Sequence, residues 1–133
     1  VMIAGSYTPV ALLALPKVSG IVVLSLQWGM ALLGVVVAAT REKTPTPLRL
    51  ALYLGMGWMI ALLIPQVMAV AGPATLGWML AGGVFYTVGA VIYAAKRPNL
   101  WPGRFGFHEL WHLFVLGGAI CHLLVMVTLY ARI

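Results

Sequence analysis

The chain is poor in charged side chains, and acidic ones are almost missing. Charged residues make up 8% of its 133 residues, and the two acids are Glu42 and Glu109. Hydrophobic residues make up 63%, and the mean hydropathy is +1.06. A soluble domain of this size cannot bury so much apolar surface. The composition therefore excludes a soluble globular protein and indicates an all-α or β-barrel integral membrane protein.

Cysteine is also scarce, and patterns typical of nucleic-acid binding are missing. The single cysteine, Cys121, lies within an apolar stretch, which excludes an internal disulfide and predicts a small buried packing residue. The net charge of +6 comes from lysines and arginines in short segments beside apolar stretches. Because no aromatic-interleaved basic pattern accompanies them, we expect no nucleic-acid partner and instead a lipid bilayer around the chain.

Long apolar stretches predict a helical bundle of about five transmembrane helices, in one domain spanning residues 1–133. A helix needs about 20 residues to cross the bilayer, and the strict alternation of barrel strands is absent. Pro65 and Gln66 are expected to kink or end the third helix. The first stretch is too short and lacks the basic region of a signal peptide, so we expect an N-terminally truncated fragment. The expected stretches are residues 1–15, 18–39, 48–70, 74–95 and 107–130.

The distribution of cations predicts an orientation. Six lysines and arginines fall near two loops on one side of the membrane, and two fall on the other side. Because cytoplasmic loops carry the excess of positive charge, we expect the first side to be cytoplasmic and the C-terminus to lie on the opposite side. The six are Arg41, Lys43, Arg49, Lys96, Arg97 and Arg104, and the two are Lys17 and Arg132.

Two histidines at the start of the last stretch are the candidate metal ligands. His108 and His112 are four residues apart, so a helix places them on one face with Cβ atoms about 5–6 Å apart. Ionisable residues inside a span are rare and mark functional sites. An interfacial role is the alternative for a single histidine, but the pair in a chain so poor in charge favours a zinc site.

The other titratable residues add less. His108, Glu109 and His112 match the His-Glu-x-x-His pattern of zinc proteases, in which the glutamate acts as a base. Glu109 points about 100° away from His108 on a helix, so its role as a base is open. His122 lies about 15 Å beyond His112 along the helix axis, and we expect it to be buried and hydrogen-bonded to a neighbouring helix. Glu42 resembles a solvated loop residue, so further ligands are expected upstream of Val1.

Two segments resemble the hemolysin III family, the bacterial branch of the progestin and adipoQ receptor superfamily. Residues 100–117 resemble the signature of the family's last helix, with the sequence LWPGRFGFHELWHLFVLG. Residues 3–9 look like the signature of its third helix, with the sequence IAGSYTP. Both signatures occur in the right order, so the resemblance covers essentially the whole chain.

The resemblance implies the last part of a seven-helix fold in a bacterial inner membrane, with an external C-terminus. It implies a Zn²⁺ ion near the cytoplasmic face, held by His108, His112 and a third histidine from the second helix. A serine there and an aspartate at the start of the third helix accompany the ligands, and none of these three residues is in this chain. The superfamily is similar to alkaline ceramidases, which implies hydrolysis of a lipid amide or ester.

Three functions remain open from the sequence. The first is a zinc-dependent membrane hydrolase acting on a lipid substrate, with no catalytic residue assigned in this chain. The second is a non-enzymatic protein: a membrane-homeostasis factor, a pore-forming haemolytic protein, or a receptor-like protein with structural zinc. The third is an intramembrane zinc protease, and it is disfavoured because no acidic residue follows Glu109.

Overall fold

The computed structural model describes residues 1–40, 45–101 and 103–132, with the backbone alone for Thr46. Arg41, Glu42, Lys43 and Pro102, on which some of the expectations rest, lie outside these residues. The regular structure of the described residues is helical, which confirms the all-α prediction. The elements are α1 (Met2–Leu13), α2 (Lys17–Thr40), α3 (Thr46–Trp58), the short 3-10 helix η1 (Met59–Leu63), α4 (Ile64–Ala95) and α5 (Phe107–Tyr130).

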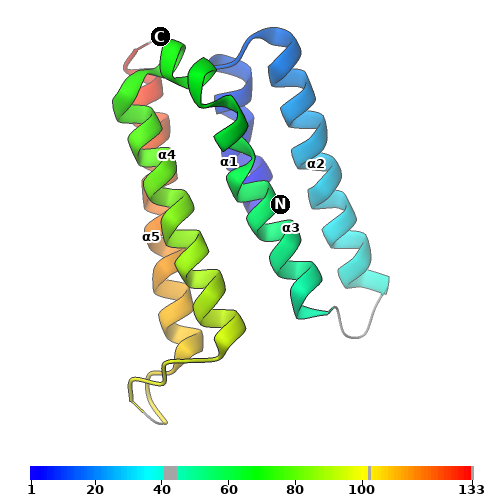
Figure 1. Ribbon diagram of the computed structural model, residues 1–133, viewed down its shortest axis with the longest axis vertical. Coiled ribbons are helices and arrows are strands. Elements are labelled where there is room, and N and C mark those ends of the chain that lie inside the picture. Colours follow the sequence, from blue (N-terminus) through cyan, green and yellow to red (C-terminus); the bar gives the residue numbers. More distant parts are fainter. Residues whose placement is uncertain (41–44, 102, 133) are drawn as a thin grey trace.

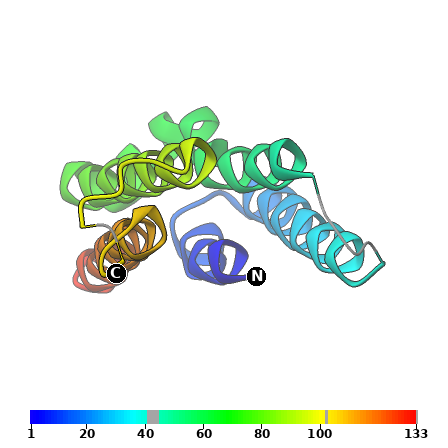
Figure 2. The same cartoon turned by 90° about the horizontal axis from the view of Figure 1, so that it is seen from below.

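The helices pack side by side as a bundle (Figure 1). Helices α3 and α4 form one row, and α1 lies on one side of that row between α5 and α2 (Figure 2). The most extensive packing joins α4 to α5. The last turn of α2 and the first turn of α3 lie at the same end of the bundle as the connection between α4 and α5 (Figure 1).

The prediction of five separate spans is wrong in number. Three helical segments are long and apolar enough to cross a membrane: Lys17–Thr40, Pro47–Ala95 and Phe107–Tyr130. Helix α1 has only 12 residues. The expected third and fourth helices are joined in the 49-residue middle segment. The backbone breaks at Gly72, with φ 76° and ψ 178°, just before Pro73. The expected Gly-Pro break is therefore present, and it divides the middle segment into two helical parts.

The third predicted helix also ends earlier than expected, at Trp58 instead of near residue 70. Pro65 explains the difference, because its ring has no N–H and collides with the carbonyl four residues earlier, at Ala61. The chain relieves this conflict with the 3-10 turns of η1, and α4 then begins at Ile64 with proline in its first turn. The chain keeps its direction through η1 and the first turns of α4 and reverses at the Gly72 break, so that α3 and the part of α4 after Gly72 run antiparallel (Figure 1).

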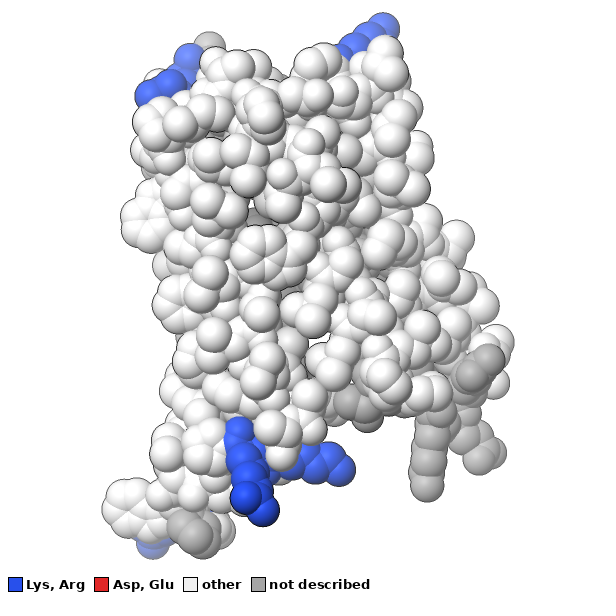
Figure 3. Space-filling view, in the orientation of Figure 1, with Lys and Arg blue, Asp and Glu red and all other residues white. Residues whose placement is uncertain are grey.

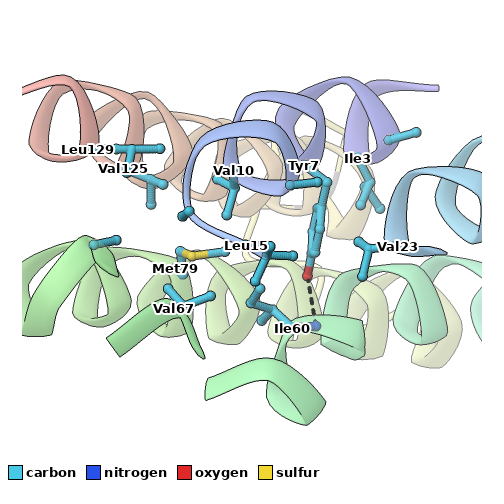
Figure 4. Close-up of a cluster of buried hydrophobic side chains, with 14 of the residues drawn as sticks. Ile3, Tyr7, Val10, Leu15, Val23, Ile60, Val67, Met79, Val125 and Leu129 are labelled. Atoms are coloured by element: carbon cyan, nitrogen blue, oxygen red, sulfur yellow. Dashed lines mark hydrogen bonds between the residues drawn. The ribbon is translucent and has the colours of Figure 1, made fainter. Parts of the chain in front are cut away.

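Two buried side chains supply hydrogen bonds at the end of α3. The Tyr7 hydroxyl donates to the Gly57 carbonyl at 2.5 Å and accepts from the Ile60 N–H at 3.3 Å (Figure 4). The Gln27 amide donates to the Met56 carbonyl at 2.8 Å. A helix end leaves carbonyls without partners, and lipid offers none. These hydrogen bonds therefore attach α1, through Tyr7, and α2, through Gln27, to the end of α3.

Lysines and arginines lie at the two ends of the molecule, and the face between them shows no charged side chain (Figure 3). Within the described ranges, one end carries Arg49 at the start of α3 and the three cations of the connection between α4 and α5. Lys17, at the start of α2, and Arg132, after α5, lie at the other end. Arg49 and the cations of the connection between α4 and α5 therefore lie on one side, as expected, whereas Arg41 and Lys43 lie outside the described residues. The cations of the connection are Lys96, Arg97 and Arg104.

A close approach of α1 and α2 predicts that Gly20→Ala destabilises the protein. A Cβ atom at Gly20 would overlap the carbonyl oxygen of Ala11, whereas one at Gly34 of the same helix would meet nothing. We expect Gly20→Ala to lower the free energy of unfolding by about 1–3 kcal/mol, as overpacking does. Gly34→Ala should leave it unchanged or raise it by up to about 1 kcal/mol. Thermal unfolding in detergent, followed by circular dichroism, distinguishes the two; equal midpoints would contradict the packing.

The hydrogen bonds of Tyr7 give a second prediction. Tyr7→Phe removes the partner of two buried backbone groups, and we expect a loss of about 1–3 kcal/mol in the free energy of unfolding. Tyr130→Phe is the matched control, because Tyr130 is 62% exposed. The two variants should differ in the detergent or denaturant concentration at which helicity is lost. A Tyr7→Phe protein as stable as the control would show that the break after α3 does not need this hydroxyl.

Candidate metal centre

The start of α5 is fixed by two side chains that cap its first N–H groups. Gly106 N–H donates to Glu109 Oε2 at 2.9 Å, and Phe107 N–H donates to Asn99 Oδ1 at 3.1 Å. Gly106 itself has an extended backbone, with φ −107° and ψ −169°. The four N-terminal N–H groups of a helix have no partner within it, so these bonds define where α5 begins. His108 therefore lies in the first turn and His112 in the second.

The two histidine rings converge. Nε2 of His108 and Nε2 of His112 are 3.2 Å apart, and the rings are nearly perpendicular, with centroids 4.7 Å apart and an angle of 87°. Both residues are exposed. The two rings thus lie together on one helix face, and the Nε2 atoms of both are in direct contact.

This geometry fits two ligands of one zinc ion. Histidine nitrogens bind zinc at about 2.0–2.1 Å, so two of them in a tetrahedral site lie about 3.3 Å apart. The observed 3.2 Å matches that separation. Without an ion, the same separation is that of an N–H···N hydrogen bond between two neutral imidazoles, in which the tautomers decide which ring donates.

Aromatic side chains enclose one side of the pair. The Trp111 indole lies 5.4 Å from the His108 ring and 4.4 Å from the His112 ring, measured between centroids. Tyr93 of α4 packs on the other side of this indole at 5.1 Å. The sequence analysis missed both residues. The position of Trp111 between the histidines offered a signal for it, but nothing local to Tyr93 shows that α4 brings it here.

The structure gives Glu109 a role at the helix start. Its carboxylate accepts the Gly106 N–H, as the third residue of a capping motif does. This bond accounts for the glutamate of the His-Glu-x-x-His pattern without any role as a base. The resemblance to zinc proteases is therefore a property of helix capping in this chain.

His122 is buried as expected, but its hydrogen bond was assigned to the wrong partner. Its Nδ1 is 2.9 Å from the carbonyl oxygen of Gly118 in its own helix. The ring packs against α4, where a Cβ atom at Gly82 would collide with it and where Tyr86 lies 5.4 Å away. His122 bonds locally because the glycine at position 82 lets α4 approach so closely that the ring fills the contact. Cys121 beside it is buried, as predicted.

The described part of the chain contains no third metal ligand near the pair. Across residues 1–40, 45–101 and 103–132, no group of three His, Cys, Asp or Glu side chains is placed to hold an ion. Glu42 lies outside these residues. The pair therefore supplies two ligands of a zinc site, and a complete site needs donors from elsewhere.

A cavity of about 180 Å³ lies beside the pair, between α3, α4 and α5. Trp111 belongs to both, since its indole contacts the histidine rings and lines the cavity. The walls are mostly apolar and aromatic, and the Tyr53 hydroxyl is buried there without a hydrogen-bond partner. The Arg49 guanidinium lies 6.0 Å from the centre of the Tyr93 ring. The lining residues are Arg49, Leu50, Tyr53, Ala90, Tyr93 and Trp111.

Comparison of the sequence with known proteins identifies its relatives. The chain is 34% identical over 119 residues to a "Hemolysin-3 homolog" of Bacillus subtilis (strain 168), covering 90% of this chain and 53% of that protein. It is 32% identical over 118 residues to "Hemolysin-3" of Bacillus cereus, covering 89% of this chain and 51% of that protein. The chain thus spans about half the length of these curated relatives.

More distant similarity reaches eukaryotes. The "ADIPOR-like receptor IZH2" of Saccharomyces cerevisiae is 40% identical over 60 residues, or 41% of this chain and 19% of that protein. No solved structure matches. The family model described as "Haemolysin-III related" matches residues 1–123. This match covers nearly the whole chain, including the histidine pair, and the chain therefore belongs to the haemolysin-III related family of membrane proteins.

Proposed function

We propose that His108 and His112 bind one zinc ion near the cytoplasmic face and that this site hydrolyses an amide or ester bond of a lipid. The observation that carries the proposal is the 3.2 Å separation of the two Nε2 atoms, which is close to the separation of about 3.3 Å between two nitrogen ligands of one tetrahedral ion. Imidazole nitrogen is also among the ligands that zinc prefers. When bound, zinc supplies a Lewis acid for the attack of water on a carbonyl group.

The residues of this chain contribute ligands and their orientation. Asn99 and Glu109 fix the first turn of α5, and the helix then sets the two imidazoles on one face. The family resemblance implies that a third histidine completes the set of protein ligands. A zinc site with three protein ligands keeps a fourth position open, as hydrolysis requires.

The cavity beside the pair supports a lipid substrate. Its walls are apolar and aromatic, and the Arg49 cation and the unpaired Tyr53 hydroxyl are its main polar groups. Pockets of this composition hold apolar ligands and orient them with a few polar contacts. Because the cavity lies at the end of a membrane protein and shares Trp111 with the histidines, the polar end of a lipid fits it best.

A non-enzymatic function is the second candidate, and the role of Glu109 favours it. The carboxylate that lies between the histidines in the sequence caps α5, which gives it a structural role. Zinc in such a site would be structural. Two relatives are named a hemolysin and a receptor, and a structural zinc ion is compatible with either function.

The zinc proposal predicts metal stoichiometry. The gene's complete product, purified in detergent at neutral pH with zinc supplied, should contain about one zinc per chain, and the His108→Ala, His112→Ala double variant should lose it. His122→Gln is the control, because His122 lies on the α4 contact, away from the pair, and this variant should keep its zinc. Plasma emission spectrometry measures the metal. Wild-type protein without zinc would refute the site.

Hydrolysis is tested separately from zinc binding. The zinc-loaded wild type should release fatty acid from a lipid amide or ester in mixed micelles, and the double variant should show no release above background. Mass spectrometry of the products across a panel of lipid amides and esters measures this. Stoichiometric zinc without hydrolysis of any lipid in the panel would favour the structural role.

The orientation is also a proposal, since the confirmed arrangement gives only which loops share a side. We propose that the end with Lys96, Arg97 and Arg104 is cytoplasmic. In a Cys121→Ser background, a cysteine at Arg97 should react with an impermeant maleimide in inside-out vesicles and stay protected in right-side-out vesicles. A cysteine at Lys17 should show the reverse. The opposite pattern would invert the membrane orientation and place the histidine pair outside.

A further inference from the structure

We propose that Trp111 is a positioning residue for the His108–His112 pair, and that Gly89 and Tyr93 of α4 form the seat that holds its indole in place. The inference rests on the proposed zinc site and extends it to the residues that orient the ligands. It makes the packing of α4 against α5 a determinant of metal affinity.

The indole contacts both rings that must converge. It lies 4.4 Å from the His112 ring at an angle of 46° and 5.4 Å from the His108 ring at 48°. Both histidines are exposed, so the rest of their surroundings restrains them little. The second side-chain torsion of histidine is broad, so an exposed ring rotates readily and its Nε2 atom moves with it. A flat side chain against both rings removes much of this freedom.

Helix α4 holds the indole from the other side. Tyr93 packs on it at 5.1 Å, with an angle of 47° between the rings. Gly89 lies one helical turn away, and a Cβ atom there would be 3.1 Å from Phe114 Cβ and 3.4 Å from Trp111 Cδ1. The absence of a side chain at position 89 is what lets the Trp111 turn of α5 lie this close to α4.

Trp111 acts through the histidines and does not bind the metal itself. Its indole N–H is a donor only, so it offers no lone pair to a cation. The electron-rich ring face favours a positively charged neighbour, and a metal-bound imidazole carries part of the charge of the ion. Loss of groups that orient metal ligands weakens metal affinity by about 10–100-fold in other proteins. We expect a loss of at least about 10-fold here.

The experiment is a cobalt titration of the complete gene product in detergent, because Co²⁺ in a zinc site reports both affinity and ligand geometry in its visible spectrum. Trp111→Leu should bind Co²⁺ at least about 10-fold more weakly and show altered absorption bands at saturation. Trp78→Leu is the matched control, since Trp78 lies on α4 and is 39% exposed. Trp111→Phe should bind with intermediate affinity, and it carries the test if the leucine variant does not fold.

The seat is tested without touching the aromatic ring. Gly89→Ala should weaken Co²⁺ binding, because the added methyl group would lie only 3.1 Å from Phe114 Cβ and would displace this part of α5, which also carries Trp111. Gly77→Ala of the same helix should bind as the wild type does, since a Cβ atom there meets nothing. Wild-type affinity and spectrum in both Trp111→Leu and Gly89→Ala would overturn the inference while leaving the zinc site intact. Failure of the wild type to bind Co²⁺ or Zn²⁺ would refute the proposed function itself, and this inference with it.

Discussion

The constraint on which this structure depends is that a backbone in lipid must find its hydrogen-bond partners inside the protein. Helices meet this requirement everywhere except where the chain has to break. The break after α3 is caused by Pro65, and it leaves carbonyls at Gly57 and Met56 that accept hydrogen bonds from Tyr7 and Gln27, respectively. Because these two side chains come from α1 and α2, the same hydrogen bonds that satisfy α3 also assemble the bundle.

The packing of α4 on α5 positions the side chains of the candidate site. Glycines of α4, such as Gly82 and Gly89, let the helices approach until side chains of α5 fill the space. The His122 ring packs against Gly82, and Trp111 packs near Gly89. The second contact places an aromatic ring against the two histidines that converge at 3.2 Å. Membrane packing and the geometry of the metal ligands are thus connected through one indole.

Much of this organisation could be predicted from the sequence, because the relevant signals are local. Hydropathy marks the apolar segments, loop cations mark their ends, and the i, i+4 spacing of His108 and His112 places both on one face. The end of α3 at Trp58 was missed, since the choice between a kink and a full break depends on whether other helices supply partners. That information resides in Tyr7 and Gln27, more than 25 residues away along the chain.

Contacts between helices explain the other differences. His122 was expected to reach a neighbouring helix, yet the close approach of α4 turns its Nδ1 to Gly118 in its own helix. The pairing of Trp111 with Tyr93 depends on how α4 and α5 face each other, which no periodicity within one segment determines. Glu109 belongs to a motif that is typical of catalytic zinc sites in the sequence, whereas in the structure its carboxylate caps the start of α5.

The central claim is that the two converging imidazoles share one zinc ion. X-ray absorption at the zinc edge, on the zinc-loaded complete gene product, tests it most directly. The account predicts a first shell of nitrogen and oxygen at about 2.0–2.1 Å, with the outer-shell scattering of at least two imidazole rings, lost in the His108→Ala, His112→Ala protein. A first shell of sulfur at about 2.3 Å, or a spectrum that the double substitution leaves unchanged, would contradict it.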